Sequence, residues 1–388
     1  MNSALLELSD EHQVLAKTVE DFANKVIAPV SALHDREHSF PYEVVKQMGA
    51  MGLFALPFPE EVGGMGGDFL SLCLAIEEIA RIDQSVAVTL EAAVGLASLP
   101  IYRHGTKEQK AKYLPALLSG QSIAAFGLTE SEGGSDANGL RTSANLDGDQ
   151  WIINGSKTFI TNAGTAITSL VLVAAITGKK EDGSKEISTI IVESGAPGFS
   201  VDPAYSKLGW HASDTHPLTF NDVKVSVSNL LGERGRGYAN FLQTLDEGRI
   251  AIAALAVGAA QGCIDESLRY AKTRKAFGKV IGEHQSIAFK IAEMQARTHV
   301  ARLAYYHAAA LLAAGKDFKT QASIAKLVAS DAAMDNARAA TQIFGGYGFM
   351  DEYSVARHYR DSKILEIGEG TSEVQKILIA RSLGLNAS

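Results

Sequence analysis

The chain has 388 residues, of which 46% are hydrophobic and 21% are charged, and its formal net charge is −8 at pH 7. This length exceeds one ordinary hydrophobic core and predicts two or three domains. The negative balance gives no electrostatic case for binding nucleic acid or an acidic membrane, and two cysteines are too few for a disulfide framework or a zinc site.

Residues 1–120 have helical periodicity and predict an N-terminal α-helical domain. The first helix begins at a cap signal, Ser9 and Asp10, and is expected to end at Pro29. Further helices are predicted for YEVVKQMGAMGLF, DFLSLCLAIEEIARID, residues 86–101 and KEQKAKYLPALLSG. Cys73 and Cys263 lie in apolar helical surroundings, so we expect both to be buried.

Residues 121–233 have a shorter period and predict a middle antiparallel β domain. The dipeptide Asp147-Gly148 stands between two strand-like runs, which is a hairpin signal. Further strands are predicted for SIAAFGLTE, SLVLVAAIT, EISTIIVES, FSVD and PLTFNDVKV.

Residues 234–388 return to long, Ala-rich helices and predict a C-terminal four-helix-bundle domain. The expected helices run from Tyr238 to Arg274, His284 to Ala314 and Thr320 to Phe344, followed by short helices over residues 352–363 and 372–383. The fold class is therefore α+β and multidomain, in the order α, β, α.

The N-terminal stretch MNSALLELSDEHQ has neither a basic region before an apolar run nor an Arg-rich amphipathic pattern. We also expect no apolar run that approaches the roughly 20 residues of a membrane span. Together these observations favour a cytoplasmic protein with no membrane span.

Two loops in the β domain are candidate ligand contacts. FGLTESEGGSD, residues 126–136, ends a strand with two glycines and several hydroxyls, whose amides can bind a flavin edge or a phosphate; it lacks the lysine of a Walker loop and the GxGxxG of a dinucleotide fold. KTFIT, residues 157–161, offers an aromatic ring and a hydroxyl beside a planar ligand. Each alone is also explained as a surface turn or an ordinary strand.

Three helical motifs have two interpretations each. In LDEGR, Asp246 and Arg249 share a helix face, as an ion pair or as a polar hook for a ligand. RKAFG with GEHQ, residues 274–278 and 282–285, suits a phosphate and an adenine, or an ordinary helix C-terminus. QIFGGYGF, residues 342–349, indicates close backbone approach or a helix stop.

EIGEGTSEVQ, residues 366–375, places Glu369 between two glycines. Ser372-x-x-Gln375 is a capping-box signature, which predicts a helix start near Ser372 and free amides that can hold an anion or a carbonyl. Glu369 is either a solvated loop residue or an accessible functional group. The chain has no GxSxG, HExxH or CxxC motif, so the sequence gives no sign of a serine nucleophile or a metal site as an alternative functional centre.

Taken in order over essentially the whole chain, these six motifs resemble the acyl-CoA dehydrogenase family, in its short- and medium-chain bacterial-type members. The resemblance implies an FAD-dependent oxidoreductase of fatty acid β-oxidation, usually a homotetramer. It implies dehydrogenation of an acyl-CoA to trans-2-enoyl-CoA, with electrons passed to an electron-transfer flavoprotein.

The resemblance also implies residue roles. Glu369 would abstract the α-proton and flavin N5 would accept the β-hydride. The implied FAD contacts are Phe126, Leu128, Thr129, Ser135, Phe159, Thr161, Thr371 and Glu373, and, across a subunit boundary, Arg274, Phe277, Gln285, Gln342, Gly345 and Gly346. The implied substrate contacts are Ser135, Asp246, Arg249 and Gly370, and no metal is implied.

Chemistry agrees with these roles. The backbone amide of Glu369 or Gly370, with the flavin ribityl hydroxyl, would polarise the thioester carbonyl. Burial should raise the pKa of Glu369 toward neutrality, which suits a base. Some subfamilies place the base at the position of Gly248; glycine there leaves room for Glu369, and Glu247 points elsewhere.

The chain departs from the family pattern in three places. Ser131 and Glu132 replace a proline and a glycine, which bears on loop stiffness. His211 replaces an arginine in KLGWHAS, which bears on domain packing or the rim of the acyl pocket. Gly368 replaces an aromatic residue, which enlarges the acyl pocket and predicts substrates beyond plain short straight chains.

Three other functions stay open from the sequence. They are a flavin oxidase or monooxygenase on the same fold, a noncatalytic binding subunit, and physiological operation as an enoyl-CoA reductase. Chain length, branching and a terminal carboxylate of the substrate are not determined by these motifs.

Overall fold

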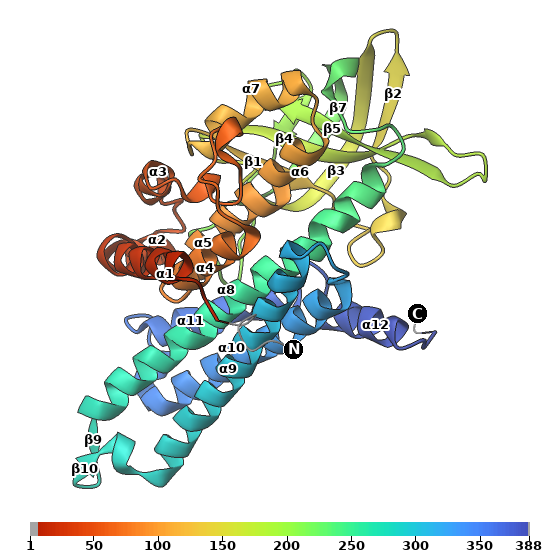
Figure 1. Ribbon diagram of the computed structural model, residues 1–388. Helices are drawn as coiled ribbons and strands as arrows, with labels where there is room; N and C mark the ends of the chain where they lie inside the picture. The colour runs from red at the N-terminus through yellow and green to blue at the C-terminus, as the bar shows by residue number, and fades with distance from the viewer. Residues whose placement is uncertain (1–6, 387–388) are drawn as a thin grey trace.

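The computed structural model describes residues 7–386 of the chain, so the targeting-segment prediction for residues 1–6 lies outside the described residues, as do residues 387–388. The N-terminal part is helical, as expected, and packs beside the sheet and the long helices (Figure 1). Its helices are α1 (Asp10–Phe22), α2 (Ala28–Glu37), α3 (Tyr42–Ala50), α4 (Phe69–Ala80), α5 (Gln84–Glu91), α6 (Leu99–His104) and α7 (Lys107–Leu118).

The first helix begins as predicted but does not end at Pro29. Ser9 is the N-cap and its side chain accepts a hydrogen bond from the His12 amide at 3.2 Å. A π-helical turn, Ala23–Ile27, follows α1, and α2 then continues to Glu37. Pro29 lies in the first turn of α2. Proline is tolerated there because the first turn of an α-helix does not need its backbone N–H for a hydrogen bond within the helix. The prediction was wrong because the π turn resets the hydrogen-bond pattern before the proline.

A second π-helical segment, Ala92–Ser98, joins α5 to α6 into one continuous helix. This helix, Gln84–His104, and the later helix Gly237–Thr273 are long and apolar enough to cross a membrane by length and composition. Our expectation that no segment approaches that length was therefore wrong. Most of both helices is buried inside the protein, and burial in a core selects the same apolar composition.

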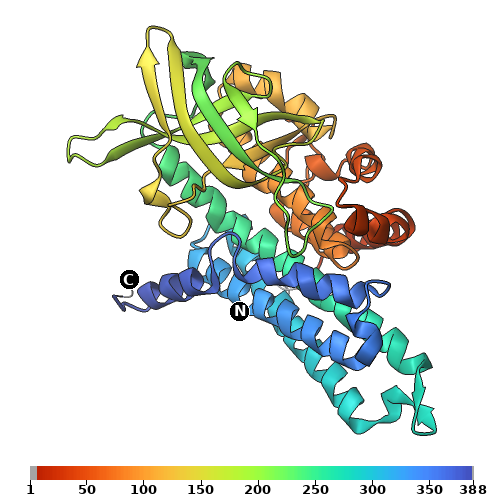
Figure 2. The same ribbon diagram turned by 180° about the vertical axis from the view of Figure 1, so that it is seen from behind.

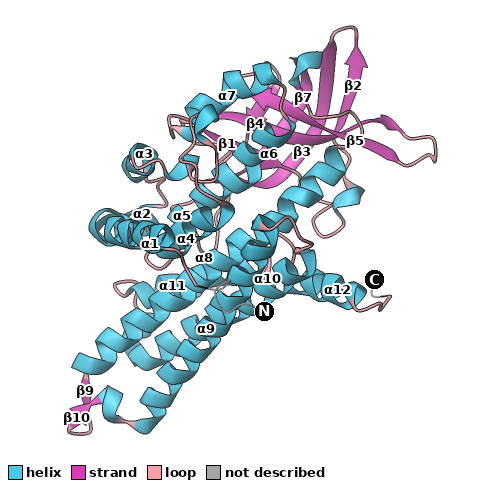
Figure 3. Cartoon of the chain, viewed as in Figure 1, coloured by secondary structure: helices cyan, strands magenta, loops and turns pink. Residues whose placement is uncertain are grey.

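The middle part is an eight-stranded sheet in the order β6-β7-β3-β2-β4-β5-β8, with β1 paired to β4 (Figure 3). Its hairpin is confirmed: Asp147 pairs with Gln150, and Gly148 adopts a φ of 61° between them. The strands are β1 (Ile123–Gly127), β2 (Ser143–Asp147), β3 (Gln150–Thr161), β4 (Thr168–Lys179), β5 (Lys185–Glu193), β6 (Phe199–Val201), β7 (Thr215–Ser226) and β8 (Leu230–Leu231).

The sheet is not wholly antiparallel, which corrects the sequence prediction. β1 runs parallel to β4, from Ile123 beside Thr168 to Gly127 beside Val173, and β2 meets β4 in parallel at one residue pair. Parallel neighbours need a long connection, and the loop after β1 together with the β2–β3 hairpin supplies it. Alternation of apolar residues does not reveal strand direction, so the sequence could not distinguish the two.

The C-terminal part is a bundle of α8 (Gly237–Thr273), α9 (Gln285–Ala313), α10 (Lys319–Phe344) and α11 (Ser354–Ser362), followed by α12 (Ser372–Ser382). The predicted ends agree with these helices to within two residues. The sequence prediction missed a short hairpin between α8 and α9, β9 (Lys275–Ala276) and β10 (Lys279–Val280). Figures 1 and 2 place this hairpin at the end of the bundle farthest from the sheet.

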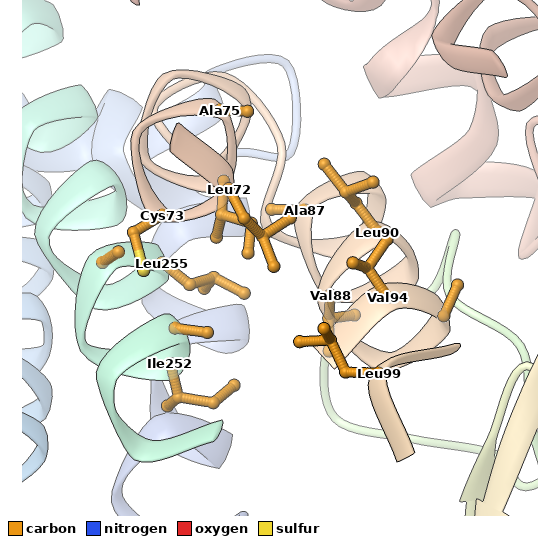
Figure 4. Close-up of a cluster of buried hydrophobic side chains, with 14 of the residues drawn as sticks. Leu72, Cys73, Ala75, Ala87, Val88, Leu90, Val94, Leu99, Ile252 and Leu255 are labelled. Atoms are coloured by element: carbon orange, nitrogen blue, oxygen red, sulfur yellow. The ribbon is translucent and has the colours of Figure 1, made fainter. Parts of the chain in front are cut away.

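A continuous core joins the N-terminal helices to α8. Figure 4 shows Leu72 of α4, Leu90 of α5, Val94 of the π segment, and Ile252 and Leu255 of α8 as members of one buried cluster. Cys73 lies in this core and Cys263 is also fully buried, which confirms the prediction for both. This core fixes the C-terminal end of α5 relative to the middle of α8, where the candidate site lies.

Candidate active site

The turn that contains Glu369 has an unusual backbone held by two side chains. Glu369 has a φ of 52°, a left-handed conformation that is uncommon for a non-glycine residue and recurs at functional sites. The next residue, Gly370, has a φ of 92°. Its carbonyl accepts hydrogen bonds from Lys326 Nζ at 2.8 Å and from Gln375 Nε2 at 2.9 Å. Tertiary contacts therefore hold the turn in place.

The helix after this turn starts where the sequence predicted, but the capping residue is different. Thr371 is the N-cap of α12 and its side chain accepts a hydrogen bond from the Val374 amide at 3.2 Å. Ser372 is already the first helical residue, and Gln375 donates to the carbonyls of Glu369 and Gly370. The predicted capping box was wrong by one residue, because Thr and Ser are both good caps and stand side by side.

The side chain of Glu369 is enclosed by three helices. Its Oε2 is shielded from solvent and has no hydrogen-bond partner of ordinary donor type within residues 7–386. Burial raises the pKa of Glu369 to about 7, while a hydrogen bond with Glu91 of α5 and the charges of Lys326 and Arg249 act in the opposite direction. A carboxylate with this balance can take up a proton near neutral pH.

Gly248 of α8 gives this carboxylate its space. A Cβ at position 248 would overlap Oε2 of Glu369 and lie 3.2 Å from its Cδ. The expectation that glycine leaves room for Glu369 is confirmed. Glu247 is directed elsewhere, as expected, because both of its oxygens meet the guanidinium of Arg103, at 2.6 and 2.5 Å.

We expect Gly248→Ala to fold but to lower kcat by about 10²-fold, because displacing the predicted base, Glu369, by about 1 Å would have an effect of this size. Steady-state turnover and thermal unfolding measure the two properties. Gly258→Ala, on the same helix, is the matched control: its Cβ would overlap the carbonyl oxygen of Glu77, away from Glu369. It should lower stability while folded molecules keep their turnover. Normal kcat in Gly248→Ala would contradict the predicted role of Glu369 as the base.

Asp246 and Arg249, the predicted substrate contacts of α8, form an ion pair beside the Glu369 carboxylate. Arg249 NH1 and Asp246 Oδ1 are 2.5 Å apart and both side chains are buried, with Lys319 Nζ 3.4 Å from the second oxygen of Asp246. Because the Arg249 charge acts on Glu369, the pair belongs to the surroundings of this carboxylate. Both earlier interpretations, ion pair and hook, are compatible with this position.

A buried ion pair ties the loop after β1 to strand β3. Lys157 Nζ lies 2.6 Å from Glu130 Oε1 and 3.1 Å from the carbonyl of Leu128. The carboxylate of Glu130 also accepts hydrogen bonds from the backbone amides of Arg141, at 2.6 Å, and Thr142, at 3.1 Å. One lysine and one glutamate thus fix both ends of the loop in which Leu128, Thr129 and Ser135 were predicted to contact FAD.

The end of β3 presents an open aromatic side chain. Phe159 has a φ of 61° and is 64% exposed, with its ring 5.2 Å from that of Tyr205. Asn162, three residues on, donates to the Thr89 carbonyl at 3.0 Å and so anchors this strand end to α5, close to Glu91. An exposed ring in a strained, fixed conformation beside a loop of hydroxyls and amides fits a planar cofactor such as flavin.

Six of the predicted FAD residues form a second group, away from Glu369. Phe277, beside the β9–β10 hairpin, has a φ of 52° and is 95% exposed. The end of α10 reaches the same place, because Phe344 stacks on Tyr270 with 4.1 Å between ring centroids. This distal group consists of Arg274, Phe277, Gln285, Gln342, Gly345 and Gly346, and one chain does not bring it to Glu369 (Figures 1 and 2).

The departures from the family pattern have local explanations in part. His211 Nδ1 lies 3.0 Å from Asp35 of α2, its ring stacks on His38 at 3.9 Å, and Arg360 of α11 pairs with Asp35 at 2.6 Å. His211 therefore helps to join the first and last parts of the chain. Glu132 pairs with the exposed Arg141. Nothing in the structure explains Ser131.

Sequence reasoning missed Glu91 and Lys326. It singled out the motifs of Lys157 and Gln375, but not the contacts of these two residues with Glu130 and with the Gly370 carbonyl. Glu91 and Lys326 are single charges within apolar helical runs, LEAAV and SIAKLVA, and both are fully buried. Since charged residues are seldom fully buried without a partner, a single charge in an apolar helical run indicates a buried polar contact. Among residues 7–386, no three or more His, Cys, Asp and Glu side chains gather as metal ligands.

Comparison with known proteins identifies the family. The N-terminal, middle and C-terminal domain models of acyl-CoA dehydrogenase match residues 9–121, 125–223 and 235–384. The chain belongs to the acyl-CoA dehydrogenase family. The α, β, α architecture expected from the sequence is the family's own, and the predicted fold class is confirmed, with the parallel strands as the correction.

Relatives match this acyl-CoA dehydrogenase over nearly its full length. A probable acyl-CoA dehydrogenase of Bacillus subtilis is 47% identical over 377 residues, covering 97% of this chain and 99% of that protein. Butyryl-CoA dehydrogenase from Megasphaera elsdenii has a TM-score of 0.94 at 42% identity, covering 98% and 99% of the two chains. A structure of the electron transferring flavoprotein of Acidaminococcus fermentans contains a chain with a TM-score of 0.94 at 41% identity, with the same coverage.

Family membership fixes the reaction class and the cofactor. The protein is an FAD-dependent enzyme of fatty acid metabolism that dehydrogenates an acyl-CoA. The flavin supplies the acceptor for the hydride when FAD is bound. The residues of the β1 loop and the end of β3 fit that cofactor, and the chemistry left to this chain is binding, orientation and proton transfer.

Proposed function

We propose that Glu369 is the base that removes the α-proton of the acyl-CoA, while the β-hydride passes to bound flavin to give trans-2-enoyl-CoA. The observation that carries this proposal is the Glu369 carboxyl itself. It is held in a strained turn, shielded from solvent, and its pKa is raised to about 7 by burial. A general base works best when its pKa lies near the working pH.

The backbone beside Glu369 suits the thioester carbonyl. Among the hydrogen bonds of the described residues, none uses the N–H of Glu369 or Gly370. Such an amide can stabilise negative charge that develops on the carbonyl oxygen as the α-proton leaves. Gly370 has no side chain in the way, and its carbonyl, in the next peptide unit, accepts a hydrogen bond from Lys326.

The remaining site residues divide between two functions and two subunits. The residues that would border the flavin are Phe126 of β1, the loop after it (Leu128, Thr129, Ser135), Phe159 and Thr161 of β3, and Thr371 and Glu373 at the start of α12. Asp246, Arg249 and Ser135 would contact the substrate. The distal group would meet the FAD of a neighbouring subunit, because the length of the bundle separates it from Glu369 (Figure 1). This arrangement favours a homotetramer.

The acyl group is proposed to extend beyond plain short straight chains. A Cβ at Gly368 would lie 3.4 Å from the Ile364 carbonyl oxygen and 3.9 Å from its Cγ1, so a side chain fits there and glycine leaves space unused. The structural relative from Megasphaera elsdenii is a butyryl-CoA dehydrogenase. A short chain is therefore the starting point for a substrate survey.

We expect a panel of acyl-CoAs, scored by flavin bleaching, to include longer or branched substrates. Gly368→Tyr should reduce kcat/KM for those substrates by about tenfold or more, the effect expected of losing pocket volume. Butyryl-CoA should be nearly unaffected and serves as the internal control. Strict butyryl preference in the wild type would contradict the proposal.

The reaction is tested by mixing the flavin-loaded protein with acyl-CoA in the absence of oxygen. Loss of yellow absorbance and formation of trans-2-enoyl-CoA, detected by mass spectrometry, would support the proposal. Rapid oxygen consumption without another acceptor would identify an oxidase, and failure to retain flavin would identify a binding subunit. Reoxidation by an electron-transfer flavoprotein tests the proposed electron acceptor, and supplying enoyl-CoA with reduced acceptor tests the reverse direction.

Two further assignments stand as proposals. The domain boundaries are placed at residues 1–120, 121–233 and 234–388, and limited proteolysis near the two junctions would test them. A cytoplasmic location without a membrane span is proposed on the burial of both long apolar helices in the core. Cell fractionation tests the location.

A further inference from the structure

Glu91 is a buried acid that the proposed reaction does not use. It is the last residue of α5, has no exposed surface, and neither of its carboxyl oxygens meets a conventional donor in the part of the chain that is described. The π-helical segment begins at the next residue, and a Cβ at Gly95 would lie 3.2 Å from Glu91 Oε1. π-Helical turns are frequent at functional sites.

The partner of Glu91 is Glu369. The two carboxyls lie within hydrogen-bonding reach of each other. Two ionised carboxylates have only acceptors, so they can hydrogen-bond only when one of them carries a proton. An unpaired buried charge is also strongly unfavourable. Both arguments require one proton on the pair.

The charges around the pair decide which carboxyl holds that proton. Arg249 of α8 and Lys326 of α10 face Glu369 and favour its ionised form. Burial raises the pKa of Glu91 well above its usual range, and the negative charge of Glu369 raises it further, with no cation opposing either effect. The proton therefore resides on Glu91 and the negative charge on Glu369.

We propose that Glu91 is a positioning residue for Glu369: its protonated carboxyl donates a hydrogen bond to the Glu369 carboxylate, which keeps that group ionised and aims its free oxygen at the substrate. This inference rests on the proposed role of Glu369 as the base. When the α-proton is transferred, it moves to Glu369 and the proton on Glu91 stays in place. The pair then changes from one proton and a single negative charge to two protons and no charge.

The test compares two replacements of Glu91. Glu91→Leu removes the donor, so the pKa of Glu369 should rise; the rising limb of kcat/KM against pH should shift upward by about one unit, a modest value for loss of a hydrogen bond to the charged form. That shift means about a tenfold loss below the limb and recovery at high pH. Glu91→Gln keeps an N–H donor and should restore the wild-type profile. Thr89→Val, a buried change on the same helix, should leave the profile unchanged.

A second measurement does not depend on turnover. Infrared spectra of the flavin-loaded protein without substrate should show a protonated carboxyl at pH 8.5 that is lost in Glu91→Gln. An unshifted pH profile in folded Glu91→Leu, a Gln variant no better than Leu, or absence of that band would overturn the inference. These results are distinguishable from failure of the proposed function, which would appear as turnover retained by a variant that lacks the Glu369 carboxylate.

Discussion

Glu369→Gln is expected to lower turnover by about 10²–10⁴-fold, the range for loss of a general base. Glutamine has nearly the same shape, so the turn and its bonds to Lys326 and Gln375 should survive. Flavin content and the affinity for acyl-CoA should therefore change little. Turnover with an artificial electron acceptor, flavin absorbance and equilibrium binding of acyl-CoA measure the three properties.

Glu247→Gln is the matched control, since Glu247 is a buried acid two residues before Arg249 on the same helix but is paired with Arg103. It should keep near-normal turnover. Substantial residual activity in Glu369→Gln would mean that another group acts as the base.

Glu369→Gln should also change the pH dependence of protein stability, because it removes a buried acid. The pKa of Glu369 is raised from 4.5 to about 7 in the folded protein, so the folded state binds the proton more tightly than the unfolded state. Its contribution to stability is complete below pH 4.5 and is lost as the pH rises toward 7. A shift of this size corresponds to at most about 3 kcal/mol. Glu369→Gln should therefore match the wild type near pH 4.5 and be more stable above pH 7.

The second large effect is expected for Lys157→Met. This change leaves Glu130 buried without its cation, and breaking a buried ion pair in this way costs about 3–5 kcal/mol. The carbonyl of Leu128 also loses its donor, so the loop after β1 should loosen. Thermal unfolding should occur at lower temperature, and titration of the apoprotein with FAD should show weaker binding.

Two variants separate charge from packing at this pair. Lys157→Met/Glu130→Gln removes both charges while keeping an acceptor for one of the Arg141 and Thr142 amides, so it should recover part of the lost stability. Lys112→Met removes a lysine from an exposed pair with Glu193 and should change stability by less than about 1 kcal/mol. Equal losses in Lys157→Met and Lys112→Met would show that the buried pair has no special role.

The helices were predictable because their signals are local. Alanine-rich periodicity and the glycine and proline residues between segments predicted α8 to α10 within two residues. Errors arose where several local solutions have similar energies, as at Pro29 and at the adjacent caps Thr371 and Ser372. Strand direction was missed for another reason, because the parallel pairing of β1 with β4 depends on the path of the chain between them.

The site was predictable only in part. Glu369 could be found because its motif is contiguous and belongs to a family signature. Glu91 and Lys326 could not, because their contacts depend on α5 and α10 meeting at one turn, and each helix by itself shows only an isolated charge. The sequence shows that such a charge is unusual, but only the fold shows which carboxyl or carbonyl it meets.

The attachment of Gly370 to Lys326 also has a consequence for the backbone at Glu369. The turn at Glu369 has few backbone hydrogen bonds of its own, and its left-handed residues would relax in an isolated peptide. Since Lys326 of α10 donates to the Gly370 carbonyl, we expect the turn to keep this shape only when α10 is packed beside it. The orientation of the Glu369 carboxyl, the proposed base, therefore depends on α10 as well as on its own turn.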